Sequence, residues 1–502
     1  MEKRKLIYPI LLKNAPNWFA NLLRDSGVPV AQSKEESDEY SIIICDGSTD
    51  VDVNSEKKLI ISWNSLLPDI FQNDNDIMQS LYMPSKICWI ENGIPLTENC
   101  ISDNLRQSII QNLSRKVSDH GLPWICFNHC PAGYDNLFNF RIDIDENEPD
   151  DWKRVIKALQ PVSHATTWFL NVSATEKSPI IYKWLKDSDI HSHGYHHHIH
   201  KFDDRLNRME LQKAKEILNT NECNGRGFAP PCGRISSGLQ NIAAEMKYQF
   251  ISALGDPNGG LPIRDHHGIW QIHSLPISEG LYLDNNISNS EIIIQGYLAM
   301  AMRAFENHKP LLLYGHAERR LGRKPEIISL IIDELNHMGK FWQVSLTKYI
   351  QWLNQRNTMN FNVVALNDEN SHFQLSWSHT ISEVKPQVNF IWKDHVQQFA
   401  MKDYSGTFNI TMDQIFESLI NKETVKRAEI KVVSEPVSLK IQIRETLDWE
   451  RETPPAILFK GGVRSRVKAI LRWLTDNRWR KKQRAKEWKL YCNECCERSK
   501  AA

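Results

Sequence analysis

The chain has 502 residues, of which 41% are hydrophobic and 24% are charged, the composition of a folded soluble protein with roughly three domains. Its 61 basic and 61 acidic residues give a formal net charge of zero, which excludes a molecule drawn by its overall charge to nucleic acid or membranes. We expect no membrane span, because no run of about eighteen apolar residues occurs, and no signal peptide, because Lys13, Asn14 and Pro16 interrupt the first apolar stretch.

Residues 1–122 are predicted to form a small α/β region. Apolar runs at residues 40–47 and 57–62 are bounded by turn or polar residues, as buried strands are, and residues 87–96 indicate one further strand. Residues 17–27 have helical spacing, so we expect a small parallel sheet with helices. No glycine-rich phosphate-binding motif is present, and we assign no nucleotide site to this region.

Residues 123–357 alternate between predicted strands and predicted helices. This βα alternation is typical of parallel strands, arranged either in a barrel or in an open sheet. The predicted strands lie at residues 138–145, 164–172, 227–231, 248–255, 269–278, 309–316 and 341–346. The predicted helices lie at residues 148–159, 203–218, 238–246, 290–308 and 325–339.

Residues 358–460 are predicted to form a small β-rich module. Short runs with alternating apolar and polar residues are typical of antiparallel strands that bury one face. The runs lie at residues 361–368, 372–378, 388–394 and 407–412, with a less regular continuation at residues 437–443.

Residues 461–502 are predicted to form a basic helical tail. Between Arg464 and Leu490 the sequence has eleven basic and two acidic residues, and its apolar positions keep helical spacing. The tail fits either a solvent-exposed helix or a helix in peripheral contact with an anionic membrane. We expect no nucleic acid partner, because no other feature supports one.

Ten cysteines are scattered along the chain. Cys126 with Cys130, and the group near Cys492, resemble half of a zinc site, but neither group has an obvious partner to complete four ligands. We therefore expect buried or incidental thiols, kept reduced in the cytoplasm.

Polar residues at the ends of predicted strands are the strongest functional signal. Asp143 and Asp145 end one strand, His316 ends another, and six histidines fall within residues 191–200. Two histidines four residues apart and one carboxylate can bind a divalent metal and leave a position open for water. A second carboxylate can then take a proton from the water, and a separate histidine can protonate a leaving group. The alternatives are a solvated histidine-rich loop and a salt-bridged pair of aspartates.

Five stretches, in order, resemble the motifs of the polysaccharide deacetylase superfamily, carbohydrate esterase family 4, with its nodulation-deacetylase type of catalytic domain. The resemblance extends from about residue 127 to residue 352, and it implies a distorted (β/α) barrel. The stretches are FRIDIDE, SHGYHH, GFAPPCGRISSGL, IHSLPIS and LYGHAERRLGRKP.

The resemblance implies a role for six residues. It implies Asp145, His193 and His197 as ligands of a divalent metal, with zinc favoured by this ligand set. It implies Asp143 as the general base and His316 as the general acid. A backbone N–H of the third motif helps to hold the oxyanion in this family. Because Pro230 and Pro231 have no N–H group, the first available donor is that of Cys232.

The third motif departs from the family. An arginine that holds the catalytic aspartate is expected where this chain has Ala229, and Arg226 or Arg234 are the substitutes that the sequence offers. The acidic partner of the last histidine is also missing from its usual place, where Asp256 and Asp265 are weak substitutes.

The function implied by the resemblance is metal-dependent removal of N-acetyl groups from the amino sugars of a glycan or oligosaccharide. Ala229 leaves open a catalytically impaired protein that binds glycan or acts as a scaffold. A hydrolase of a small cyclic amide is the third hypothesis. We expect a cytoplasmic protein, associated with the membrane if the tail binds lipid.

Overall fold

The computed structural model of the chain consists of two compact units, Met1–Ile441 and Gln442–Ala502. It describes residues 6–32, 39–46, 58–67, 86–91, 94–98, 101–197, 204–223, 225–233, 235, 237–255, 260–276, 278–283, 289–366, 372–380, 384–392, 395–401, 403–411, 462–475, 478 and 482. Within these ranges, no helix combines the length and the apolar character needed to cross a bilayer.

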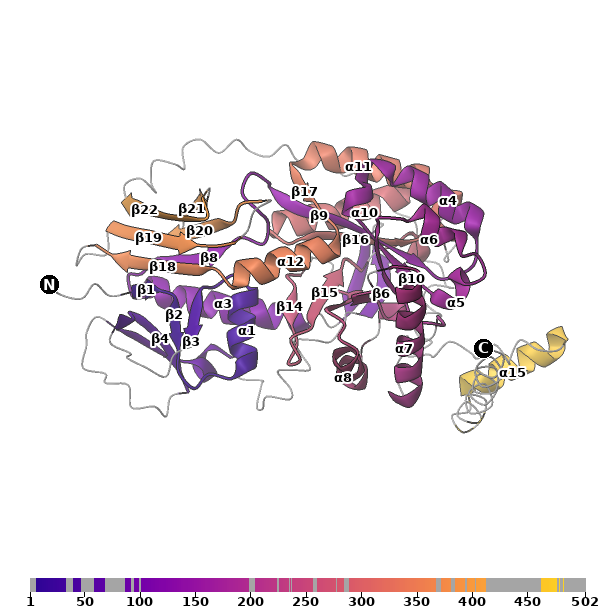
Figure 1. The fold of residues 1–502 in the computed structure, drawn as a ribbon, viewed down its shortest axis with the longest axis horizontal. Helices are drawn as coiled ribbons and strands as arrows, with labels where there is room; N and C mark the ends of the chain where they lie inside the picture. Colours follow the sequence, from indigo (N-terminus) through magenta and orange to yellow (C-terminus); the bar gives the residue numbers. More distant parts are fainter. Residues whose placement is uncertain are drawn as a thin grey trace. The chain divides into compact units, whose positions relative to one another are not determined.

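The larger unit is built around a nine-stranded sheet (Figure 1). The strand order is β14-β15-β13-β12-β11-β10-β9-β16, and β17 pairs with the beginning of β9. All neighbouring strands run parallel except β14 and β15. In chain order the strands are β9 (Asn136–Ile144), β10 (Thr166–Leu170), β11 (Asp189–Ser192), β12 (Gly227–Phe228), β13 (Phe250–Leu254), β14 (Ile263–Arg264), β15 (Trp270–Ser274), β16 (Leu311–His316) and β17 (Phe341–Gln343).

This sheet curls toward closure. Just after β15, the backbone N–H of Leu275 donates to the carbonyl of Leu312 in β16, although these strands lie at opposite ends of the strand order. The sheet is therefore a distorted (β/α) barrel, and the predicted fold class is confirmed. Central strand β9 is buried over its whole length, as expected for a parallel strand enclosed on both faces.

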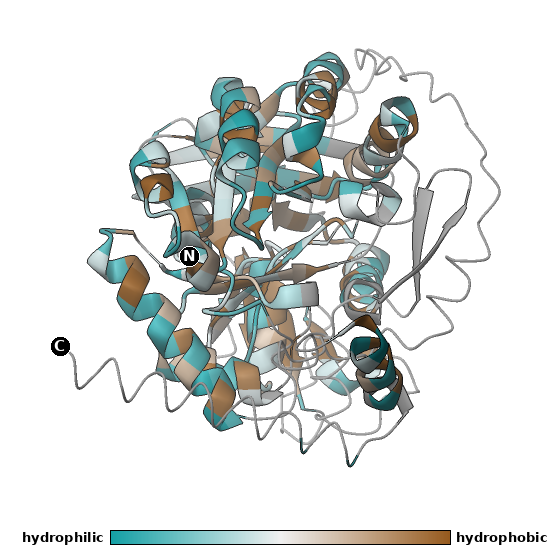
Figure 2. Ribbon diagram, turned by 90° about the vertical axis from the view of Figure 1, so that its right-hand side faces the viewer, coloured by the Kyte–Doolittle hydropathy of each residue, from teal (hydrophilic) through white to brown (hydrophobic). Residues whose placement is uncertain are grey.

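Helices surround the barrel (Figure 1). They carry both polar and apolar residues along their length (Figure 2), because one face of each helix packs on the sheet and the other meets water. Helix α10 is capped by Asn289, whose side chain accepts a hydrogen bond from the Glu291 N–H. The helices are α4 (Pro149–Ala158), α5 (Val172–Thr175), α6 (Ile180–Trp184), α7 (Asp204–Thr220), α8 (Ser237–Glu245), α9 (Glu279–Leu283), α10 (Ser290–Glu306), α11 (Glu326–Met338) and α12 (Leu346–Asn357).

The segments before and after the barrel share one hydrophobic core. Strand β1 (Leu6–Tyr8) pairs antiparallel with β18 (Asn360–Ala365), and β8 (Trp124–Phe127) pairs antiparallel with β20 (Gln387–Trp392). Buried side chains from both segments, including Phe127, Phe361 and Phe390, belong to the same cluster. The domain boundaries at residues 122, 357 and 460 stay a prediction.

The remaining elements of the larger unit extend these two segments. The parallel sheet expected near the N-terminus has the order β3-β2-β4-β5, and β18 continues into the antiparallel order β18-β19-β22. The elements are β2 (Ile10–Leu12), α1 (Asn17–Asp25), β3 (Val30–Gln32), β4 (Ile42–Cys45), β5 (Leu59–Ser62), β6 (Lys86–Glu91), β7 (Ile94–Glu98), α3 (Ile101–Asp119), β19 (His372–Ser378), β21 (His395–Ala400) and β22 (Ser405–Thr411).

Two local features of the structure differ from the expectations, and one expectation falls on residues that are not described. The region expected as a single strand at residues 87–96 contains two antiparallel strands, β6 and β7, in which Glu91 pairs with Ile94. Strand β11 and helix α12 were not expected, because the strand is half polar and the helix follows a strand without a break. The run at residues 437–443 lies outside the described residues.

The CFNHC segment contains one buried thiol, Cys130, and one partly buried thiol, Cys126. Burial raises the pKa of Cys126 to about 11 and that of Cys130 to about 12, so both side chains stay protonated. A thiolate is the form that binds zinc, so this environment does not favour a metal site. The cysteines near Cys492 lie outside the described residues.

A buried polar network holds β11 beneath its C-terminal end. Asp189 accepts hydrogen bonds from the Thr167 hydroxyl at 3.0 Å and the Thr347 N–H at 3.2 Å, and its carboxylate lies 3.0 Å from Nε2 of His191. Burial acts to raise the pKa of Asp189, but His191 and the hydrogen bonds from Thr347 outweigh it and lower the pKa to about 2. The network joins β11 to β10 and α12.

Stability should depend on Asp189 at low pH. Its folded pKa of about 2 lies below the ordinary value of 3.8, so the charged form contributes about 2 kcal/mol to stability above pH 3.8, which is lost as the pH falls through 2. We expect Asp189→Asn to lower the melting temperature at pH 6 and the difference to vanish near pH 2. The exposed Asp187→Asn is the control, and a difference that stays constant with pH would contradict the assignment.

Candidate active site

Strand β9 delivers two carboxylates to one end of the barrel. Successive side chains of a strand alternate between faces, so Arg141, Asp143 and Asp145 lie on the same face. Asp143 is buried near the end of β9, and Asp145 follows the last residue of the strand. Neighbouring β10 and β16 run parallel to β9, so their C-terminal ends reach the same edge.

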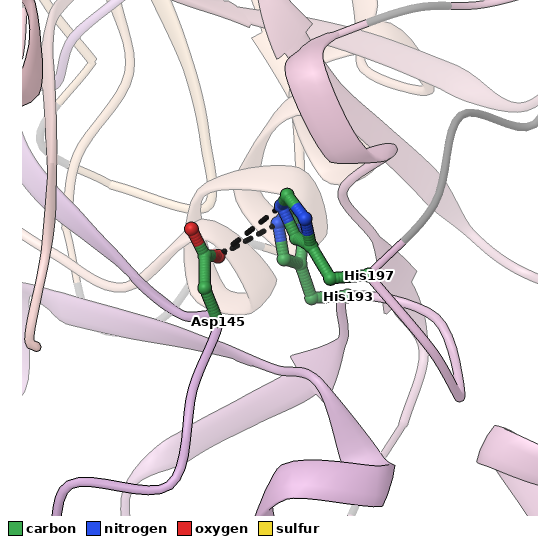
Figure 3. A group of neighbouring side chains, drawn as sticks. All are labelled: Asp145, His193 and His197. Carbon is green, nitrogen blue, oxygen red and sulfur yellow. Dashed lines mark ion pairs between the residues drawn. The ribbon is translucent and has the colours of Figure 1, made fainter. Parts of the chain in front are cut away.

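Two histidines reach Asp145 from the segment that follows β11 (Figure 3). Nε2 of His193 lies 3.3 Å and Nε2 of His197 lies 3.4 Å from the same oxygen, Oδ1 of Asp145. Nδ1 of His193 lies 2.7 Å from the Ala229 carbonyl, which can only accept a hydrogen bond. This ring therefore carries its proton on Nδ1 and presents the lone pair of Nε2 to Asp145.

These three residues fit a metal ion. Their ligand atoms lie within 4.8 Å of one another, and theirs is the one such group of histidine, cysteine or acidic residues found in the described ranges. Oδ1 of Asp145 is buried without a hydrogen-bond donor. An unsatisfied carboxylate oxygen facing two imidazole nitrogens is costly, unless a cation lies between them.

The ionisation of Asp145 and His197 is consistent with metal binding. Burial acts to raise the pKa of Asp145, but His197, His193 and His316 outweigh it and hold the pKa well below its ordinary value. Burial lowers the pKa of His197. His193 differs, because Asp143 and Asp145 outweigh burial and raise its pKa.

The turn that carries Asp145 is held from both sides. The Asn171 side chain, after β10, donates to the Asp145 carbonyl at 2.7 Å. The Glu318 carboxylate, after β16, accepts from the Glu146 N–H at 2.8 Å. The two strands that flank β9 thus fix the position of this carboxylate.

Arg141 is the cation that pairs with Asp143. The motif of the family places an arginine at position 229, where this chain has an alanine. Nε of Arg141 donates to Oδ1 of Asp143 at 2.7 Å and its Nη2 donates to Oδ2 at 2.5 Å, a bidentate pair that sets the plane of the carboxylate. Nη1 donates to the carbonyl of Ser252 in β13 at 2.8 Å, on the far side of the barrel interior. Burial acts to raise the pKa of Asp143, but Arg141, with His193 and His316, outweighs it and lowers the pKa.

Sequence reasoning looked for this arginine in the third motif and missed it. Arg141 lies two residues before Asp143 on the same strand, so the i, i+2 spacing was the available signal. Ala229 contributes its backbone carbonyl to His193 instead of a side chain. The structure gives no description of Arg234, one of the two expected substitutes.

His316 is oriented by a buried glutamate. Oε1 of Glu279 accepts from the His316 N–H at 2.9 Å and lies 2.9 Å from Nδ1 of the same residue. The ring therefore donates through Nδ1 and turns Nε2 toward Asp145, where Oδ2 is 3.9 Å away. The Tyr297 hydroxyl donates to Oε2 of Glu279, and burial together with Glu279 raises the pKa of Tyr297, so it remains a donor.

Glu279 was not found from the sequence. Of the acids considered, Asp256 lies outside the described residues, and Asp265 accepts hydrogen bonds from the Ile269 N–H and the Gln271 side chain. Glu279 begins a short helix, α9, and no motif marks it. Glu279 reaches His316 only because folding places the start of α9 beside the end of β16.

The other histidines of the cluster have different positions. His191 is fully buried against Asp189, and Nδ1 of His196 lies 2.8 Å from Oε1 of Glu210 in α7. His198 and His200 lie outside the described residues. Cys232 lies in the 3₁₀ turn Pro231–Gly233, directly after β12, and its role as an oxyanion donor stays a prediction.

Part of the chain matches a known protein family. Residues 124–251, about a quarter of the chain, match the family model "Polysaccharide deacetylase". No significant match was found among curated proteins.

Solved structures resemble only part of the chain. A provisionally assigned polysaccharide deacetylase from Mycobacterium smegmatis is 15% identical over 45% of this chain and 92% of its own, with a TM-score of 0.40. A similar protein from Pseudomonas aeruginosa PAO1 is also 15% identical over 47% and 95%, with a TM-score of 0.40. A CE4 family pseudoenzyme from Bacillus anthracis is 16% identical over 43% and 65%, with a TM-score of 0.33.

The matched segment begins at β8 and ends in β13, and it contains Asp143, Asp145, His193 and His197. Residues 124–251 therefore match the polysaccharide deacetylase family, and the resemblance expected from the motifs is confirmed for this segment.

Proposed function

We propose that this chain is a metal-dependent hydrolase that removes N-acetyl groups from the amino sugars of a glycan or oligosaccharide. The observation that carries the proposal is the convergence of Asp145, His193 and His197 beside two further, separately oriented groups, Asp143 and His316. The family of residues 124–251 supports an acetylated glycan as the substrate.

The metal would be held by Asp145, His193 and His197, and the two nitrogens with one carboxylate favour zinc. When bound, such an ion supplies Lewis acidity, which polarises an amide carbonyl and lowers the pKa of water. The chain must supply the rest of the chemistry: a base, an acid and a donor for the developing oxyanion.

Asp143 is the proposed base. Its Oδ2 lies 3.8 Å from Nε2 of His193, which places the carboxylate beside the metal ligands without making it one of them. Arg141 fixes its plane and keeps it ionised, so it is ready to accept the proton of an attacking water.

His316 is the proposed acid. It lies across the site from His193, and Glu279 holds its Nδ1, so that Nε2 can give a proton to the departing amine. The contact with Glu279 fixes the orientation of the ring for that transfer. The backbone N–H of Cys232 is the proposed donor to the oxyanion.

Arg141 argues against the impaired alternative. The third motif of the sequence has no arginine to pair with Asp143, the proposed base. Without such a partner, the carboxylate would be poorly oriented and its pKa would be less depressed. The bidentate pair with Arg141 removes that objection, and activity is the simpler hypothesis.

Metal binding tests the ligand set. We expect the purified, chelator-treated protein to bind Zn²⁺, and His193→Ala to weaken binding on the order of 100-fold or more because an essential ligand is lost. Isothermal titration calorimetry measures this, with His266→Ala, an exposed histidine elsewhere, as the control. Equal affinities for wild type and His193→Ala would exclude the proposed ligands.

Acetate release tests the reaction. We expect the zinc-loaded protein to release acetate from N-acetylglucosamine oligosaccharides. Asp143→Asn should bind zinc normally but lose roughly 10²–10⁴-fold in turnover, because the base is gone. Asp150→Asn, an exposed acid on α4, should change nothing. Turnover by Asp143→Asn at the wild-type rate would refute the role of Asp143, and release from small cyclic amides alone would favour the other substrate class.

The clamp on Asp143 can be tested separately. Arg141→Lys keeps the charge but cannot make two parallel hydrogen bonds to the carboxylate. Losing one charge-assisted bond, about 1.5–3 kcal/mol, should reduce acetate release about 10- to 100-fold. Zinc affinity should not change. Arg323→Lys, an exposed arginine, is the control, and unaltered turnover in Arg141→Lys would show that the pair does not orient the base.

A further inference from the structure

Helix α15 (Val463–Thr475), in the smaller unit, exposes an unusual number of aliphatic side chains. Seven large hydrophobic side chains are exposed within the described ranges, and three of them belong to this helix of 13 residues. Val463, Val467 and Leu471 are 76%, 51% and 56% exposed. They are spaced by four residues and so line one face of the helix.

All charged residues of α15 are basic. The helix contains Arg464, Arg466, Lys468 and Arg472, and residues 463–475 include no acidic residue. Over Arg464 to Leu490, eleven basic and two acidic residues give a charge of +9. Because the whole chain is neutral, the other residues carry a net charge of −9, so the excess positive charge of the chain is concentrated in this segment.

The aliphatic stripe decides between the two anionic partners that could bind such a helix. Nucleic acid binds through its phosphates and bases, and an exposed row of valine and leucine contributes nothing to phosphate contacts. A bilayer surface uses both features, because aliphatic side chains enter the acyl boundary while Lys and Arg meet the lipid headgroups.

We propose that α15 is a docking helix for the surface of an anionic lipid membrane. Its apolar stripe lies in the interface, and its arginines and lysine bind the headgroups. The helix rests on the membrane without crossing it. This inference does not depend on the proposed hydrolase activity, which belongs to residues of the larger unit.

Vesicle co-sedimentation of the full-length protein tests the proposal. We expect binding at about 100 mM salt to vesicles of phosphatidylcholine with phosphatidylglycerol, and none to phosphatidylcholine alone. Lys468→Gln with Arg472→Gln should weaken binding roughly 25-fold, about fivefold for each charge. Val467→Ser with Leu471→Ser should abolish it at unchanged charge, because the buried apolar area is lost.

Matched variants control for general surface effects. Ile180→Ser with Leu330→Ser removes two comparably exposed aliphatic side chains from the larger unit, and Lys157→Gln with Lys186→Gln removes two exposed charges. Neither pair should change vesicle binding, and no variant should change acetate release. The proposal is wrong if anionic vesicles do not bind, or if binding is insensitive to the serine pair in α15. Tighter binding to duplex DNA, lost with the glutamine pair but not with the serine pair, would assign the helix to nucleic acid instead.

Discussion

Parallel strands that end at one edge of a curled sheet are the constraint on which the site depends. In the register of the barrel, Asp143 of β9 lies opposite His316 of β16 and opposite Phe169 of β10. One strand further, Ser192 of β11 lies opposite Leu170 and is followed at once by His193. Side chains separated by more than 170 residues in the chain thus meet because the hydrogen-bonded ladder fixes where each strand stops.

Buried negative charge is the second constraint. Asp143, Asp145 and Glu279 all lie near the same end of the barrel, and a buried carboxylate is tolerated only beside a cation or several donors. Each has a different partner: Arg141 for Asp143, the His316 ring for Glu279, and the proposed metal for Asp145. This division gives three neighbouring acids separate partners, so that each can take a distinct role within a small volume.

Contacts outside the site hold the site residues in position. Buried Asp189 and His191 brace β11 from beneath, while Asn171 and Glu318 hold the turn of Asp145 from the flanking strands. The segments on either side of the barrel share a core and pair through β1 with β18 and through β8 with β20. The chain therefore enters and leaves the barrel at points tied to each other, which restrains both ends of the barrel.

The sequence by itself determined the alternation of strands and helices and the polar groups at strand ends, Asp143, Asp145 and His316. The resemblance of its motifs to a known family implied the barrel class and singled out His193 and His197. These depend on local patterns: hydrophobic period, polar residues at strand ends, and motif spacing. The tertiary structure alone decided that Arg141 replaces the arginine absent at Ala229, and that Glu279 is the acid beside His316. The i, i+2 spacing placed Arg141 on the same face as Asp143 but could not show that they pair, and no motif marked Glu279. The partner of a guanidinium or a carboxylate depends on which group folding brings within hydrogen-bonding distance.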